Sequence, residues 1–189
     1  MLNFSKYSFI IAVFVFGSYA RDDKDKDSDL DLCIICENLP FGLLLILREE
    51  IAKMLEISQK SIVIYTTSDL EQMSRKGSMF MWHLKLEGKL IYSIPNDKLI
   101  DKCFNNLNPY NNADEDLKIY KSLLDDIKVS VIDKEEINEF DLALIFTVAR
   151  NTCMVLCEYK GVPRFGRKDG FSTLAEFYQD KLPLKKIHI

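Results

Sequence analysis

The chain has 189 residues and a formal net charge of −4, and 48% of its residues are hydrophobic. A chain of this length forms one large domain or two small ones, and its apolar content excludes disorder of the whole chain. The acidic balance argues against a broad nucleic-acid interface, which needs a basic face. It leaves open a small anionic ligand that is bound through a local metal site.

The N-terminal segment fits two descriptions. Residues 1–20 carry an apolar run from Phe9 to Phe16 and end in small residues, as a secretory signal does. The run is also short and rich in Ile, Val and Phe, as a buried β-strand is. We favour the strand, because cleavage after Ala20 would divide a motif that continues to Asp31. No other apolar run approaches the roughly 18 residues of a membrane span, so we expect a soluble, cytoplasmic protein without a membrane partner.

Strands and helices alternate in the prediction as far as residue 95. In chain order they are a strand at 8–16, a polar loop at 17–28, a strand at 29–36, a helix at 41–57, a strand at 60–67, a helix at 69–86 and a strand at 89–94. Ser68 is expected to cap the helix at 69–86, because Glu71 follows it at the spacing of a capping box.

The amino-acid composition changes after residue 95. The segment at 96–113 is rich in Asn, Pro and Asp and is expected to be a linker. Helical periodicity follows at 115–128, 134–160 and 170–181. We therefore expect an α+β protein with a small α/β domain built on a mixed β-sheet at 1–95, a linker at 96–113 and an all-helical bundle at 114–189.

The cysteines are odd in number and scattered, which argues against a disulfide framework. They are Cys33, Cys36, Cys103, Cys153 and Cys157. Cys33 and Cys36 form a CxxC, but they lie in an apolar strand, where residues three apart point to opposite faces. No second pair lies at zinc-site spacing. We interpret all five as small core residues.

Two carboxylates stand at the start of the strand at 29–36. Asp29 and Asp31 are two residues apart, so they share one face of the strand, while Leu30 and Leu32 face the core. Adjacent carboxylates repel each other, and a divalent cation between them turns the repulsion into ligation. Mg²⁺ suits such a site, because it prefers one or two carboxylates together with phosphate oxygens and water.

A Gly-Ser pair ends the preceding strand. Gly17 lets the backbone approach a bulky anion, and the neighbouring N–H groups and the Ser18 hydroxyl can donate to phosphate oxygens. A phosphate site and a metal site at the ends of two neighbouring strands suit in-line transfer of a nucleotidyl group, in which two metal ions stabilise the attacking and leaving oxygens.

The whole pattern resembles a known signature. Gly-Ser, then ten residues, then Asp-Leu-Asp-Leu is similar to the motif of the polymerase-β-type nucleotidyltransferase superfamily, and FGSYAR and SDLDL resemble its minimal and antibiotic-modifying branches. The resemblance implies that Gly17 and Ser18 bind the phosphates of a nucleotide. It also implies that Asp29 and Asp31 are catalytic residues that bind metal. The segment at 146–177 is similar to the helical C-terminal domain attached to such enzymes.

Two positions depart from the family's pattern. Asp22 stands where the family usually has a glycine, in Ala-Arg-Gly-Asp. The family also commonly places a third carboxylate on a later strand, where it completes the metal site or takes a proton from the acceptor. The strand at 60–67 has none; Asp69 lies just past its end and could substitute, although its position favours a helix cap. Without this third carboxylate, three alternatives stay open: the chain is a weak enzyme, it recruits a base from its helical domain, or it binds nucleotide without turnover.

The leading hypothesis is a metal-dependent nucleotidyltransferase. It would move a nucleoside monophosphate from a nucleoside triphosphate, with ATP the first choice, to a hydroxyl of a small molecule or a protein, and it would use Mg²⁺, with two ions expected. The alternative is a catalytically weak or inactive regulatory or antitoxin-like partner protein. Nucleic acid is the least favoured acceptor because the chain is acidic. The nucleotide, the acceptor, the general base, and assembly as a homodimer or with a partner protein stay open.

Overall fold

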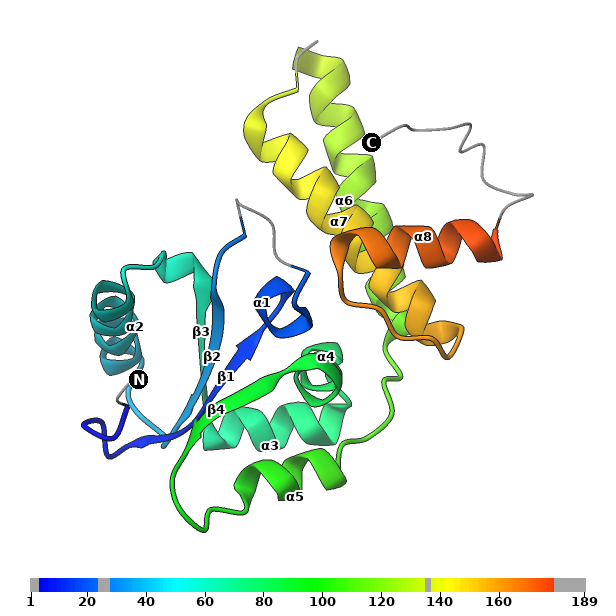
Figure 1. The fold of residues 1–189 in the computed structure, drawn as a ribbon. Coiled ribbons are helices and arrows are strands. Elements are labelled where there is room, and N and C mark those ends of the chain that lie inside the picture. The colour runs from blue at the N-terminus through cyan, green and yellow to red at the C-terminus, as the bar shows by residue number, and fades with distance from the viewer. Residues whose placement is uncertain (1–3, 24–27, 135–136, 179–189) are drawn as a thin grey trace. The chain divides into compact units, whose positions relative to one another are not determined.

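The computed structural model describes residues 4–23, 28–134 and 137–178. The chain divides into two compact units, Met1–Tyr110 and Asn111–Ile189. The first unit contains a small mixed β-sheet with helices, and the second contains helices (Figure 1). The protein is therefore α+β, as the sequence predicts.

A four-stranded sheet in the order β3-β2-β1-β4 organises the first unit. The strands are β1 (Ile10–Phe16), β2 (Asp31–Cys36), β3 (Ile62–Thr66) and β4 (Lys89–Ser93). β1 runs antiparallel to β2 and to β4, whereas β2 and β3 are parallel. β1 thus lies inside the sheet, and its residues from Ile10 to Phe14 are buried, which confirms the strand at this place in the sequence.

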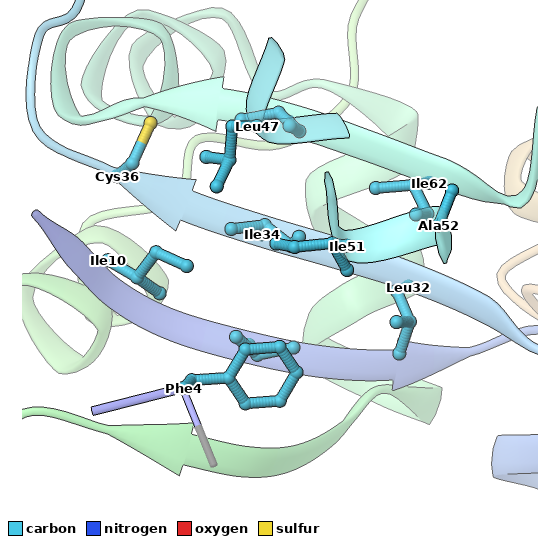
Figure 2. Packing of buried hydrophobic residues seen from close by; sticks show 11 residues of the cluster. Phe4, Ile10, Leu32, Ile34, Cys36, Leu47, Ile51, Ala52 and Ile62 are labelled. Carbon is cyan, nitrogen blue, oxygen red and sulfur yellow. The ribbon is translucent and has the colours of Figure 1, made fainter. Parts of the chain in front are cut away.

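Helices cover both faces of this sheet (Figure 1). They are α2 (Phe41–Leu55) on one face and α3 (Thr67–Lys76), α4 (Met79–Glu87) and α5 (Leu99–Asn105) on the other. Figure 2 shows the core under α2, where Leu47 and Ile51 of the helix pack with Ile34 of β2. Each aliphatic side chain buried in this way stabilises the fold by about 1.5–3 kcal/mol.

The helix expected at 69–86 is two helices, which corrects the prediction. Gly77 has a φ of 65°, a left-handed conformation that ends α3, and α4 starts two residues later. The cap also differs from the expected Ser68 and Glu71. Because β3 ends at Thr66, the Thr66 hydroxyl accepts from the backbone N–H of Asp69 at 3.2 Å, and Asp69 Oδ2 accepts from the backbone N–H of Thr66 at 2.9 Å.

Part of the expected linker at 96–113 packs against the sheet. Leu99–Asn105 forms α5, and Cys103 and Leu107 lie in the core on that face. The Ser74 hydroxyl donates to the carbonyl of Cys103 at 2.7 Å and ties α5 to α3. Asn and Pro residues flank this helix of only seven residues, and for this reason composition alone indicates a linker.

All five cysteines are buried and free, which agrees with their interpretation as core residues. Cys33 and Cys36 belong to the clusters on opposite faces of the sheet, as expected for residues three apart on a strand. Burial, with the nearby charges of Asp69 and Glu37, raises the pKa of the Cys36 thiol to about 11. Burial also raises the pKa of Cys153 to about 11, so these thiols stay protonated.

The second unit is built on three described helices, α6 (Ala113–Lys134), α7 (Glu139–Tyr159) and α8 (Arg167–Phe177). α7 packs against both of the others. Its residues Cys153 and Cys157 form a small core with Leu174 of α8. The α7 helix begins at an Asn138 cap, whose side chain accepts from the backbone N–H of Asp141 at 2.9 Å.

Among the described residues, α7 is the one helix that is long and apolar enough to cross a membrane by length and composition. This finding differs from the expectation that no apolar run beyond the N-terminal segment approaches the length of a membrane span. Of its most apolar window, 28% is buried within the protein. One such helix is a weak indication of a span, because the core helix of a soluble protein meets the same criteria.

Candidate active site

The pairing of β1 with β2 brings Gly17 against Asp31. Phe16, the last residue of β1, pairs with Asp31, the first residue of β2, and Gly17 follows at once. Gly17 has φ 70° and ψ −150°, a region that is essentially restricted to glycine. A Cβ atom at this position would lie 2.6 Å from Oδ2 of Asp31. The missing side chain therefore leaves room for the carboxylate directly beside the turn.

The Gly-Ser turn continues into the short helix α1 (Ser18–Arg21), in which Ser18 is half-buried. The carbonyl of Gly17 accepts from the backbone N–H groups of Ala20 at 3.1 Å and Arg21 at 3.2 Å. These two amides are thus already used within the turn. Donation to a bound phosphate would fall to the Ser18 hydroxyl and to the amides at the beginning of the turn.

Asp22, which stands in place of the family's usual glycine, closes α1 in the left-handed conformation with φ 61°. Asp is one of the few residues with a side chain that tolerate this conformation. Lys89 Nζ lies 2.8 Å from Asp22 Oδ2 and adds an exposed ion pair. The departure from the family's pattern therefore keeps the backbone turn that the glycine would make.

Of the two predicted metal ligands, one opens β2 and the other precedes it, because β2 begins at residue 31 and not at 29 as expected. Asp31 is half-buried and opens the strand, and Asp29 is exposed just before it. Leu30 and Leu32 pack with the cluster under α2, in line with the predicted alternation of carboxylates and core residues. Lys24 to Asp27 of the same loop lie outside the described residues.

Within the part of the chain that the structure describes, the strand beside β2 offers no third carboxylate next to Asp31. In the parallel register of β2 and β3, Leu32 pairs with Ile62, so the residue next to Asp31 is Ser61, which is buried. Asp69 lies past the other end of β3, where Thr66 pairs with Cys36. Five residues of strand separate that end from Asp31, a distance of roughly 16 Å. Asp69 therefore cannot complete a site at Asp31, and its carboxylate serves the α3 cap.

Substitution of Asp69 separates these roles. We expect Asp69→Ala to lower the free energy of unfolding by about 1 kcal/mol, because it removes the cap of α3. The same variant should bind nucleotide with wild-type affinity. Chemical denaturation and a nucleotide titration, both followed by fluorescence of the single Trp82, measure the two quantities. Weakened nucleotide binding at unchanged stability would contradict the assignment of Asp69 to the cap.

A charged cluster that the sequence analysis missed borders the turn. Arg21 Nη1 lies 2.8 Å from Glu87 Oε2 at the end of α4, and His83 Nε2 lies 3.3 Å from the same oxygen. The Arg21 and Glu87 side chains are 17% and 18% exposed, and His83 is 5% exposed. Burial alone would raise the pKa of Glu87, but the contacts with His83 and Arg21 outweigh it and lower this pKa below its ordinary value.

Because the pKa of Glu87 is lowered in the folded protein, the free energy of unfolding should depend on pH in the acid range. A carboxyl whose pKa is lower in the folded state than in the unfolded chain contributes stability above its ordinary pKa of 4.5 and loses it as the pH falls through the folded value. We expect Glu87→Gln to lose about 1–2 kcal/mol of stability at neutral pH and to show a flatter decline in acid. Urea denaturation from about pH 6 to pH 3 measures this profile.

Glu49→Gln, which removes an exposed pair with Lys53, is the control and should follow the wild-type profile closely. Parallel acid profiles of Glu87→Gln and the wild type would contradict the prediction.

The residues at the start of β2 fit a magnesium–nucleotide complex. Among the residues that the structure describes, no three His, Cys, Asp or Glu side chains are grouped as a complete metal site. Mg²⁺ needs fewer, since it binds through one or two carboxylates and completes its shell with phosphate oxygens and water. Because position 17 has no side chain, the Asp31 carboxylate lies directly against the Gly17 backbone, where one ligand could contact both. Asp31 and Asp29 would hold the ion.

Several solved structures are similar to this chain. Similar solved structures include a spectinomycin adenyltransferase from Enterococcus faecialis, with ATP and spectinomycin, at 14% identity and a TM-score of 0.52; the match covers 90% of this chain and 77% of that one. A toxin–antitoxin with AMP-PNP is 15% identical at a TM-score of 0.35, over 67% and 87% of the two chains. A mutant of the toxin–antitoxin MntA-HpeT is 13% identical at a TM-score of 0.39, over 70% and 91%.

The first of these structures shows a shared fold. No curated protein matches the chain significantly. The polymerase beta, nucleotidyltransferase family matches residues 3–97, half of the chain, and this stretch contains β1, the Gly-Ser turn, both aspartates and β4. The chain therefore belongs to the polymerase beta nucleotidyltransferase family.

Proposed function

We propose that this protein transfers a nucleoside monophosphate from a nucleoside triphosphate to a hydroxyl of a small molecule or a protein. The observation that supports the proposal most is the placement of Asp31 beside Gly17. A carboxylate for metal and a side-chain-free turn for phosphates lie together at the ends of two paired strands. Membership of the nucleotidyltransferase family gives this pair of features its chemical meaning.

In this proposal each residue has a defined task. The Gly17 turn and the Ser18 hydroxyl bind and orient the phosphates, and Asp29 and Asp31 hold Mg²⁺. The bound ion would neutralise charge on the phosphate oxygens. The acceptor oxygen forms a bond to the α-phosphorus, the bond from the α-phosphorus to the β-phosphate oxygen breaks, and pyrophosphate leaves with the release of the hydroxyl proton. The two aspartates provide for one ion; the second ion expected from the sequence stays a prediction.

The choice of nucleotide is also part of the proposal. The spectinomycin adenyltransferase of similar fold was solved with ATP, and this makes ATP the first nucleotide to test. The experiment follows thermal unfolding of the first unit through Trp82 with each nucleoside triphosphate, with and without Mg²⁺. A nucleotide at about 100 times its dissociation constant stabilises by roughly 2.7 kcal/mol, so a metal-dependent shift of several degrees is expected. The absence of any shift with all four nucleotides would contradict the proposal.

A second function, a nucleotide-binding partner protein with little or no turnover, has one observation in its favour. By the register of β2 and β3, Ser61, the residue just before β3, is the neighbour of Asp31, and the described residues place no further carboxylate there. The two functions differ in one assay. Incubation with ATP labelled in its α-phosphate, Mg²⁺ and a panel of hydroxyl acceptors transfers label if the chain is an enzyme. Metal-dependent binding without transfer of label to any acceptor or to the chain favours the partner protein.

A further inference from the structure

The Gly-Ser turn depends on contacts outside itself. Its helix α1 has only four residues, and a helix this short has no stability of its own. The turn must nevertheless keep Gly17 in a conformation that few backbones adopt. Some other part of the fold must therefore hold the turn in place.

The end of α4 supplies the strongest of these contacts. Glu87 Oε2 accepts a hydrogen bond from Arg21 Nη1 of α1 at 2.8 Å and lies 3.3 Å from His83 Nε2. His83 is itself fixed, because its ring packs edge-on against Phe16, the last residue of β1, with ring centroids 5.6 Å apart, and against Phe80 at 6.2 Å. A chain of packed and charged groups thus runs from the core of the sheet to the turn.

A second contact lies just beyond the first. Lys89 and Asp22 pair at 2.8 Å, so residues 21 and 22 of the turn bind to residues 87 and 89 on either side of Gly88. The Lys89 and Asp22 side chains are 51% and 81% exposed, and an exposed pair contributes little. The Arg21–Glu87 pair is shielded from water, and a charged hydrogen bond in such a place is worth more.

We propose that Glu87, together with Arg21 and His83, is a positioning group for the phosphate-binding turn. It acts through α1: it keeps Gly17 against Asp31 and the Ser18 hydroxyl directed at the same ligand, without itself touching nucleotide or metal. The inference rests on the proposed function only for the consequence on nucleotide binding. Its consequence for the turn can be measured without any ligand.

The test uses the full chain and the variant Glu87→Gln, with Glu49→Gln as the matched control. Glu49 also forms an ion pair with a basic residue, Lys53, at 2.6 Å, but on the exposed surface of α2. In hydrogen exchange of the nucleotide-free protein, Glu87→Gln should speed exchange of the amides at 17–23 by about tenfold or more, while those of β2 stay protected. The dissociation constant for Mg²⁺-ATP should rise by a similar factor. The control should change neither.

Two further variants separate positioning from a general loss of structure. Arg21→Gln should reproduce both effects. The double variant Arg21→Gln with Glu87→Gln should lose less than the sum of the two single variants, because both remove the Arg21–Glu87 contact, while Arg21 alone also pairs with Asp23 at 3.0 Å. If Glu87→Gln does not fold, the milder Arg21→Lys, which keeps the charge, should show the same local increase in exchange at smaller size.

The outcomes are distinguishable from those of the proposed function. Unchanged exchange at 17–23 and unchanged Mg²⁺-ATP affinity in Glu87→Gln would overturn the inference and leave the proposed function standing. Equal acceleration in β2 would also overturn it, because Glu87 would then support the whole unit. If the wild type does not bind Mg²⁺-ATP, the proposed function fails, and the exchange pattern alone decides the inference.

Discussion

Asp31→Asn should abolish the Mg²⁺-dependent stabilisation by nucleotide while leaving the protein folded. The substitution preserves the shape of a side chain that is half-buried at the start of β2. It removes the negative charge of one of the two carboxylates that would hold Mg²⁺. The full ligand contribution, about 2.7 kcal/mol at 100 times the dissociation constant, should therefore disappear. The unfolding midpoint without nucleotide should stay within about 2 °C of the wild type, as for a substitution that changes stability by less than 1 kcal/mol.

The measurement is thermal unfolding with ATP, with and without Mg²⁺, followed through Trp82. Asp101→Asn on α5 provides a control, because Asp101 is an exposed carboxylate outside the turn and β2. That variant should retain the full shift. A Mg²⁺-dependent shift in Asp31→Asn equal to that of the wild type would show that the metal is held elsewhere.

Gly17→Ala carries the second large effect. A residue with a side chain at this position would have to adopt φ 70° and ψ −150°, a region that is nearly restricted to glycine. Its Cβ would also lie 2.6 Å from Asp31 Oδ2. The backbone conformation alone costs of order 1–3 kcal/mol. We expect the variant to lose at least about 2 kcal/mol of stability, and to bind nucleotide weakly because the carboxylate or the turn must move.

Gly161→Ala is the matched control for this prediction. Gly161 has φ 73°, close to that of Gly17, but an added Cβ there would meet no atom within 4 Å. It should lose only about 1 kcal/mol, the cost of the backbone conformation without the collision. Urea denaturation of both variants, followed by circular dichroism, compares them. A Gly17→Ala variant as stable as Gly161→Ala would show that Asp31 is not held against the turn.

Local pattern was sufficient to predict much of the first unit. The run of β-branched and aromatic residues marks β1, and the alternation of Leu30, Asp31 and Leu32 assigns the faces of β2. These features depend on neighbours one or two residues apart, so a single sequence contains them. The approach of Gly17 to Asp31 follows from the same local reasoning, because Gly17 directly follows β1 and Asp31 opens β2, the next strand.

The errors arose where a single residue or a distant contact decides the structure. Helical periodicity continues across Gly77, and only its left-handed backbone separates α3 from α4. The Asn- and Pro-rich flanks concealed α5, which the core on that face of the sheet stabilises. The contact of Arg21 with Glu87 joins residues 66 positions apart. It depends on the register of β4 against β1, and the sequence has no pattern that reveals this register.

The buried thiols give the chain an internal set of reporters for transient opening. Cys33, Cys36 and Cys103 belong to the first unit, and Cys153 and Cys157 belong to the second. A protonated thiol that is shielded from solvent reacts with an alkylating agent only when its surroundings open. The rate of modification at each cysteine, resolved by mass spectrometry, therefore reports how often each unit opens. Added nucleotide should slow the modification of the first three thiols, because a bound ligand stabilises the folded unit.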